Sequence, residues 1–257
     1  MSLSSFARPA LIAIVLLGVL TMALLASAES ITLTGTVRDF TPTTNNDFEA
    51  TIGGWVTGIV ETNLGADGKP VYAHGTATYG SVHGQSNFDQ WYHNTANTTS
   101  YAITLSNSIA APSIYTYSNN SFFPIDGQLL GNYPGTAHNY HFTYEIHTNF
   151  TYQAGQEFSF TGDDDVWVFI NKQLVIDLGG IHSAINGSID LDTLGLTAGN
   201  TYDFDFFFAE RHTTQSNLKI ETSIALNPYN PVPEPTTMLL LGLGLIGLAG
   251  VRRKYQK

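Results

Sequence analysis

Cysteine is absent from this chain of 257 residues. A fold without disulfides must be stabilised by its hydrophobic core, by bound ions or by both. Basic residues are also scarce, with ten Lys and Arg against 21 Asp and Glu. Residues 29–231 hold five of these bases and twenty of the acids, which gives a formal net charge of −15. Nucleic acids and anionic membrane surfaces are therefore poor partners for this segment, whereas cations are good ones.

Two further absences narrow the fold and the function. Long amphipathic helical periodicity is missing, and Gly and Asn separate short apolar runs, which favours strands over helices. No P-loop, HExxH or Ser-His-Asp motif occurs, so an enzyme is not favoured. A glycosidase stays an alternative, because sequence cannot establish the spacing of the two carboxylates that such an enzyme needs.

The first 28 residues predict a secretory signal peptide. Arg8 supplies a positive flank, Ala10 to Leu25 form an apolar run, and Ala26-Ser27-Ala28 has the form of a small-x-small cleavage site. We expect the mature chain to begin at Glu29. An uncleaved N-terminal anchor is the alternative.

The other end of the chain carries a second targeting pattern. Residues 227–235 contain four prolines, which predicts an extended linker rather than a helix or a central strand. Residues 236–251 carry no charge, and residues 252–254 are basic. Sixteen uncharged residues fall slightly short of the roughly 20 that span a bilayer. Taken alone, the pattern indicates a weak transmembrane helix with its basic end on the cytoplasmic side.

The same three parts resemble the PEP-CTERM sorting signal of Gram-negative bacteria. They are Val232-Pro233-Glu234-Pro235, the apolar stretch and the terminal basic cluster in 236–257. The resemblance implies that an exosortase cuts near the Pro-Glu-Pro and removes the tail during export. We therefore expect a protein of the cell surface or extracellular matrix, transiently anchored in the membrane by its tail. A permanent tail anchor is the alternative.

The segment between the two signals reads as strands. Residues 142–153 alternate like a strand pair with a short break, 166–178 form a hairpin that turns at 171–173, 201–210 are a half-buried strand, and 218–224 alternate apolar and polar side chains. Together they predict an all-β fold, an antiparallel β-sandwich over residues 29–226.

Three adjacent carboxylates stand before the most apolar of these strands. Asp163, Asp164 and Asp165 precede the run Val166 to Ile170, and no Lys or Arg lies nearby in sequence. Adjacent like charges repel one another and favour protonation or a bound cation. A hydrated acidic turn is the alternative, because aspartate favours turns.

Eight segments resemble the fibro-slime domain, and they occur in the same order as in that family. The resemblance covers residues 37–224 and implies the β-sandwich named after protective antigen, which is found in yeast flocculins and other adhesins. The segments are VRDF (37–40), NNDFEA (45–50), DGKPVY (67–72), FDQWY (88–92), FFPIDG (122–127), HNYHFTYEIHTNFTY (138–152), GDDDVWVFINKQLVIDLGGIH (162–182) and FFFAERHTTQSNLKIETSI (206–224).

The resemblance also implies a calcium site. In lectin members of the wider group, two consecutive aspartates joined by a cis peptide hold a calcium ion (Ca2+), which in turn coordinates sugar hydroxyls. Asp163 and Asp164 fall on that pair, and Asp165 stands where a small residue is usual, so it is a substitute ligand or lies behind the pair. Asn217 is the further metal ligand that we expect, since calcium takes six to eight oxygens.

Candidate ligand-binding residues lie in loops expected at the same end of the sandwich. We expect strands 202–208 and 218–224 to pair antiparallel, so that the connection between them is an end loop carrying Arg211, His212 and Gln215. His182 follows two glycines that permit close approach of another backbone segment. Ordinary loop hydrogen bonding is the alternative for each of these residues.

Other aromatic and histidine side chains predict no site. His141 and His147 share a strand face but lie roughly 20 Å apart, too far for one zinc ion. Trp91 and Tyr92 are expected in the core. The sequence therefore predicts a non-enzymatic, calcium-dependent carbohydrate-binding adhesin, with extracellular carbohydrate or exopolysaccharide as its partner. A structural matrix protein with a purely structural calcium site is the alternative.

Overall fold

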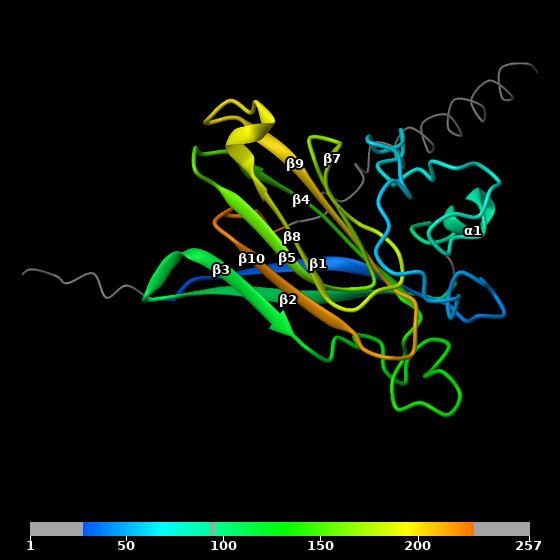
Figure 1. The fold of residues 1–257 in the computed structure, drawn as a ribbon. Coiled ribbons are helices and arrows are strands. Elements are labelled where there is room, and N and C mark those ends of the chain that lie inside the picture. The colour runs from blue at the N-terminus through cyan, green and yellow to red at the C-terminus, as the bar shows by residue number, and fades with distance from the viewer. Residues whose placement is uncertain (1–27, 94–95, 229–257) are drawn as a thin grey trace, which may run out of the picture.

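Ten antiparallel strands form one continuous sheet that folds over on itself (Figure 1). The computed structural model describes residues 28–93 and 96–228. The order of the strands across the sheet is β7-β6-β9-β4-β1-β2-β3-β10-β5-β8. The elements are β1 (Ser30–Asp39), α1 (Gln85–Phe88), β2 (Thr98–Ser108), β3 (Ala111–Asn119), β4 (Phe142–Thr151), β5 (Glu157–Asp163), β6 (Asp165–Ile170), β7 (Gln173–Leu178), β8 (Ile185–Asp190), the 3-10 helix η1 (Leu191–Leu194), β9 (Thr201–Glu210) and β10 (Asn217–Thr222).

The two ends of the sheet order approach each other, so the sandwich is nearly closed. A Cβ atom added to Gly187 on β8 would lie 2.9 Å from the side chain of Ile176 on β7. Strands of the two layers also meet through their aromatic rings, since Phe158 on β5 packs at 5.0 Å from Phe204 on β9. The predicted all-β antiparallel sandwich is confirmed.

A main hydrophobic core fills the space between the layers, and a second core lies outside it. The second core is covered by the β1–β2 insert, residues 40–97, which contains α1 (blue to teal in Figure 1). Within its described part the insert has one short helix and otherwise turns and isolated bridges. It buries Phe48, Trp91 and Tyr92 against Trp167 and Phe207 of the sheet. The expectation that Trp91 and Tyr92 belong to a core is confirmed.

The insert explains the continuous apolar run at 166–170. On β6, Val166, Val168 and Ile170 face the main core, whereas Trp167 and Phe169 face the second core. All six residues of the strand are buried. The expected hairpin is also present, because Asn171 and Lys172 both adopt positive φ in the turn between β6 and β7.

Three expectations about strands need correction. Residues 142–151 form one unbroken strand, β4, rather than a pair with a break. Strand β9 is buried on both faces from residue 204 onward rather than half-buried, because the insert covers its outer side. Strands β9 and β10 do not pair: β9 lies between β4 and β6, and β10 lies between β3 and β5.

Because β9 and β10 do not pair, the loop between them is not a hairpin turn between neighbouring strands. The β9–β10 loop, residues 211–216, crosses from one layer of the sandwich to the other. The aspartates at 163–165 do the same, because β5 and β6 also belong to different layers. Figure 1 shows the insert and the orange β9–β10 loop at the same end of the sandwich. Two layer crossings and the insert therefore meet there.

Candidate functional site

The peptide bond between Asp163 and Asp164 is cis. Asp163 ends β5, and Asp165 begins β6. All three aspartates are buried, with exposed fractions of 3%, 4% and 0% along the chain. The resemblance places its aspartate pair on the same two residues that the cis bond joins.

Asp165 is neutralised by Arg211. The Nε of Arg211 donates to Oδ2 of Asp165 at 2.6 Å, and Nη2 donates to Oδ1 at 3.1 Å. The amide of Gly180 donates a third hydrogen bond to this carboxylate, at 2.6 Å. Because Arg211 itself has an exposed fraction of 0%, the pair is fully buried.

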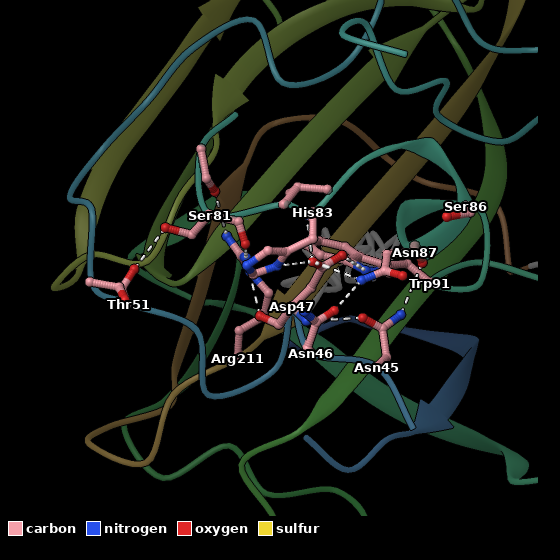
Figure 2. Close-up of polar contacts among 12 residues, drawn as sticks. Asn45, Asn46, Asp47, Thr51, Ser81, His83, Ser86, Asn87, Trp91 and Arg211 are labelled. Carbon is pink, nitrogen blue, oxygen red and sulfur yellow. Dashed lines mark hydrogen bonds and ion pairs between the residues drawn. The ribbon is translucent and has the colours of Figure 1, made fainter. Parts of the chain in front are cut away.

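Arg211 also ties the β9–β10 loop to the insert (Figure 2). Its guanidinium donates to the backbone oxygens of Asp47, Gly80 and Ser81 and lies 4.8 Å above the ring of Trp91. In this arrangement the donors of Arg211 are directed at the protein, and its expected contact with a ligand stays a prediction. Asp165, expected as a substitute metal ligand, is likewise engaged in the interior.

Asp47 organises the part of the insert that receives Arg211 (Figure 2). Its Oδ1 accepts from the backbone and the ring of His83, at 2.7 and 2.8 Å. Its Oδ2 accepts from Nε1 of Trp91 at 3.2 Å. Asn87 also donates to this side chain. These bonds fix the backbone carbonyls that surround the guanidinium of Arg211.

Asp163 and Asp164 have no such cation. Within residues 28–93 and 96–228, no Lys, Arg or His forms an ion pair with either carboxylate. Asp163 accepts from the backbone of Asn217 at 2.6 Å and from its Nδ2 at 2.9 Å. Asp164 accepts from the backbone amides of His182 and Arg211, at 3.1 and 3.0 Å. Neutral donors therefore hold both carboxylates in place, and neither carboxylate forms a salt bridge with a base among the described residues.

Burial dominates the protonation of this cluster. Burial raises the pKa of Asp164 to about 8; the positive charge of Arg211 opposes this rise, and the negative charge of Asp165 adds to it. Burial also raises the pKa of Asp163, against the donations from Asn217. Glu210 is fully buried, and burial together with the charges of Asp164 and Asp163 raises its pKa well above the usual value. The cluster therefore favours either bound protons or a bound cation.

A pocket of about 400 Å³ opens above Asp163 and Asp164. It is lined by Ile52, Asp163, Asp164, Ile181, His182, Ser183, Thr214 and Gln215. The structure thus brings together four of the residues singled out in the sequence, namely the two aspartates, His182 and Gln215. Asn217 does not line the pocket itself, but its side chain donates a hydrogen bond to Asp163.

His212 lies apart from this pocket. Its Nε2 is 3.5 Å from Oε1 of Glu49, and the same carboxylate accepts from Thr213 at 2.7 Å and from His141 at 2.8 Å. The side chain of His212 is one-fifth exposed. Its expected contact with a ligand stays a prediction, and its observed role is to hold the β9–β10 loop against the insert.

The two glycines before His182 are required by close backbone contacts, as expected. Gly180 has φ 96°, and a Cβ atom there would overlap the carbonyl oxygen of Gly54. A Cβ atom on Gly179 would lie 2.8 Å from the carbonyl oxygen of Val56. The insert therefore forms one wall of the pocket, where it contributes Ile52.

Sequence reasoning missed two members of this region. Ile52 gave no signal, because the pocket wall depends on how the insert folds back. Glu210 could have been found from its spacing: it follows Phe206 and Phe208 at intervals of two residues on β9, which places its side chain on the core-facing side of the strand. Its Oε2 is buried without a hydrogen-bond partner, although Oε1 accepts from the backbone of His212 at 3.3 Å.

Two family models match the chain. Residues 126–234 match the PA14 domain, and residues 231–254 match the PEP-CTERM protein-sorting motif. Residues 126–234 are therefore similar to the PA14 domain, and residues 231–254 to the PEP-CTERM sorting motif. Both resemblances noted in the sequence are confirmed.

Curated relatives extend the match beyond the PA14 model. Protein psiQ of Dictyostelium discoideum is 47% identical over 216 residues, which cover 78% of this chain and 22% of psiQ. Protein psiD of the same organism is 44% identical over 212 residues, covering 76% of this chain and 42% of psiD. The chain thus spans less than half the length of these relatives.

The solved structures that align with this chain have low sequence identity to it and low TM-scores. The PA14 sugar-binding domain from an RTX adhesin aligns with a TM-score of 0.35 and 12% identity, over 77% of this chain and 94% of that domain. The PA14 domain of the MpAFP antifreeze protein aligns with a TM-score of 0.34 and 12% identity, over 73% and 78%.

The targeting segments lie outside the described residues. This applies to nearly all of the signal peptide expected at 1–28, to the Pro-rich linker beyond Pro228 and to the apolar tail and basic end at 236–257. Among residues that the structure describes, no helix has the length and apolar character of a membrane span.

Proposed function

We propose that this protein is an exported, calcium-dependent carbohydrate-binding module that acts in adhesion at the cell surface or in the extracellular matrix. The observation that carries the proposal is the pair Asp163 and Asp164, two buried carboxylates at the base of an open polar pocket that form no salt bridge within residues 28–93 and 96–228. The proposed partner is an extracellular carbohydrate or exopolysaccharide.

The residues at the base of the pocket fit a calcium ion. Both aspartates supply carboxylate oxygens, and hard cations such as calcium prefer oxygen ligands. Asn217 donates to Asp163 through Nδ2, which leaves its amide oxygen available for a cation. Asp165 is already paired with Arg211, so a bound cation would interact with Asp163 and Asp164.

The remaining ligands would be neutral oxygens. In the described ranges, no group of three or more His, Cys, Asp and Glu side chains is arranged to hold a metal ion. Two carboxylates, one amide, backbone carbonyls of the β9–β10 loop and sugar hydroxyls are a ligand set that suits calcium rather than zinc. A bound calcium ion would supply positive charge that attracts sugar hydroxyls at the base of the pocket.

The pocket wall suits a neutral, hydroxyl-rich ligand. His182, Ser183, Thr214 and Gln215 offer both hydrogen-bond donors and acceptors. The domain's net charge of −15 disfavours anionic ligands at a distance. The PA14 match supports the same class of ligand, because lectins occur in the wider group that the sequence resembles.

The sorting motif supports the proposed location. We expect export through the N-terminal signal and processing by an exosortase-type enzyme near Pro235, in a Gram-negative bacterium. The intact mass of the native exported protein should lack the residues beyond about Pro235. If residues 252–257 remain in the mature product, a permanent tail anchor replaces the sorting proposal.

A glycan array tests the binding function. We expect wild-type protein in calcium to bind a subset of neutral glycans, and binding to be lost in chelator and in Asp164→Asn. Calcium-dependent stability without any glycan binding would favour a structural calcium site in a matrix protein. Hydrolysis of bacterial polysaccharides by wild type, and not by Asp164→Asn, would instead favour an enzyme.

A further inference from the structure

Half of the exposed large apolar side chains lie on the insert, and one of them lines the pocket. Large hydrophobic side chains with substantial exposure are Ile52, Trp55, Tyr79, Ile109, Leu129 and Leu130 among the described residues. Three of these six belong to the insert, and Ile52 also lines the pocket above Asp163 and Asp164. Trp55, with an exposed fraction of 59%, lies three residues further along the same segment. Exposed aromatic residues next to a polar pocket are typical of a binding surface.

The segment that carries Trp55 is held firmly by its backbone. Residues 51–58 run beside residues 179–181, which precede His182 of the pocket. The amide of Gly54 donates to the carbonyl oxygen of Ile181 at 3.0 Å, and that of Val56 donates to the carbonyl oxygen of Gly179 at 2.7 Å. On its other side, Ser81 donates to the carbonyl oxygen of Thr51 at 2.7 Å (Figure 2). The wall of the pocket and the segment of Trp55 are therefore one continuous structure.

The aromatic rings are tied at their polar atoms. Nε1 of Trp55 lies 3.4 Å from the carbonyl oxygen of Asp177, to which it donates. The hydroxyl of Tyr79 donates to the carbonyl oxygen of Thr57 at 3.2 Å, and its ring stacks at 3.8 Å on His74. An aromatic ring held in this way loses little conformational entropy when a ligand packs on it, because its orientation is already restricted.

We propose that Trp55, assisted by Ile52 and Tyr79, forms an accessory subsite for the sugar units of an extended neutral polysaccharide whose terminal or internal unit occupies the pocket. The apolar C–H faces of pyranose rings match an aromatic ring whose polar atom is already satisfied. Continuity with the pocket and the strongly negative domain favour this occupant over an anionic polymer or membrane. This inference rests on the proposed carbohydrate binding.

Tryptophan fluorescence can report on this subsite directly. The chain has three tryptophans, and the other two, Trp91 and Trp167, are both fully buried. Quenching by acrylamide therefore reports mainly on Trp55. The probes are neutral linear hexasaccharides of mannose, glucose and galactose units, each with its monosaccharide, added to the mature protein in calcium. We expect a bound hexasaccharide to shift the emission to the blue and to reduce quenching, whereas the monosaccharide leaves both unchanged.

Affinity measurements on matched variants complete the test. Trp55→Ala should weaken hexasaccharide binding about tenfold and change monosaccharide binding less than about twofold. Ile109→Ala removes a similarly exposed side chain from the β2–β3 turn and should change neither. Both variants should melt like wild type, because exposed side chains contribute little to stability.

The outcomes separate the two proposals. If none of these sugars binds to wild type in calcium, and the glycan array is also blank, carbohydrate binding fails and the subsite fails with it. If a hexasaccharide binds but Trp55→Ala binds it as wild type does, only the subsite is overturned. Equal losses for hexasaccharide and monosaccharide would also overturn it, since Trp55 would then act on the pocket itself.

Discussion

Adjacent aspartates in this chain have opposite environments. Asp165 lies on the side of the insert, where Arg211 pairs with it at 2.6 Å and neither side chain is exposed. Asp163 and Asp164 face the pocket, where backbone amides and Asn217 orient them but no base in the described part of the chain forms a salt bridge with them. In the first arrangement the two buried charges balance each other within the protein. The second leaves buried negative charge, and we interpret it as a place for a cation.

Loss of Arg211 should give the largest effect. Arg211→Met leaves Asp165 as an uncompensated buried carboxylate and removes three contacts to backbone carbonyls. We expect the free energy of unfolding to fall by about 3–5 kcal/mol, measured by urea denaturation of the mature protein. Lys219→Met is the matched control, because Lys219 and Glu221 form an exposed pair that contributes little.

The double variant sharpens this prediction. Combining Arg211→Met with Asp165→Leu removes both charges, so we expect it to recover a substantial part of the lost stability. A double variant as unstable as Arg211→Met would contradict the view that the buried charge of Asp165 is the main cost.

The calcium-free protein should lose stability as pH rises from about 4 to 8. Asp164 has a folded pKa of about 8, above its unfolded value near 3.9, so the folded state holds a proton that the unfolded state releases. Asp39, whose pKa burial raises to about 6, acts in the same direction, whereas His141, whose pKa burial lowers, opposes it. We expect a fall of several kcal/mol, because each unit of difference between the folded and unfolded pKa corresponds to about 1.4 kcal/mol.

Calcium should remove most of this slope, because a bound cation stabilises the ionised carboxylates. The measurement is urea unfolding at several pH values, with calcium and with chelator. A calcium-free stability that rises steadily between pH 6 and 8 would show that the unpaired carboxylates do not control it.

Replacement of Asn217 should have a smaller and more specific effect. Asn217→Ala removes one hydrogen bond to Asp163 and one proposed calcium ligand, so we expect a loss of about 1 kcal/mol and roughly tenfold weaker calcium binding. The matched control is Asn186→Ala. Asn186 is an exposed residue of β8 whose side chain also donates to β5, at the carbonyl oxygen of Phe160. Isothermal titration calorimetry should find the calcium affinity of Asn186→Ala unchanged. If Asn186→Ala loses as much calcium affinity as Asn217→Ala, Asn217 has no specific role at the calcium site.

Removal of the hydroxyl of Ser81 should have the smallest effect. Ser81→Ala deletes the bond to the carbonyl oxygen of Thr51 but leaves the carbonyl of Ser81 that accepts from Arg211. We expect a loss of about 0.5–1 kcal/mol in thermal unfolding and no change in calcium affinity. A loss of several kcal/mol would mean that the insert depends on this contact more than on Arg211.

Much of the fold could be predicted because apolar and polar residues alternate along its strands. Strand β10 has the expected alternation of buried and exposed residues, and the turn at Asn171-Lys172 is where the hairpin was expected. The pairing of β9 and β10 was predicted wrongly, because strands that follow each other in sequence often pair and nothing local indicates a crossing between layers. The insert was not predicted as a covering layer, so β9 was expected to be only half-buried.

Only those parts of the candidate site that depend on local sequence could be predicted. The resemblance indicated Asp163 and Asp164, which the structure places at the pocket, and two glycines indicated the backbone contact beside His182. Asn217 was chosen because its loop was expected at the same end, and it contacts Asp163. The sequence could not indicate that Arg211 turns inward, because its partner Asp165 lies 46 residues away and the other acceptors lie in the insert. Ile52 and Trp55 could not be placed for the same reason: their positions depend on long-range packing.

Thermal unfolding of the mature protein with calcium and with chelator tests the central claim most directly. Calcium that binds only the native state at Asp163 and Asp164 should add about 2.7 kcal/mol at a hundredfold excess over Kd. The melting temperature of wild type should therefore rise with calcium and return with chelator. Asp89→Asn, in the exposed part of the insert, should respond like wild type, whereas Asp164→Asn should not respond. If wild type and Asp164→Asn melt identically with and without calcium, the aspartate pair is only a buried turn and the account is contradicted.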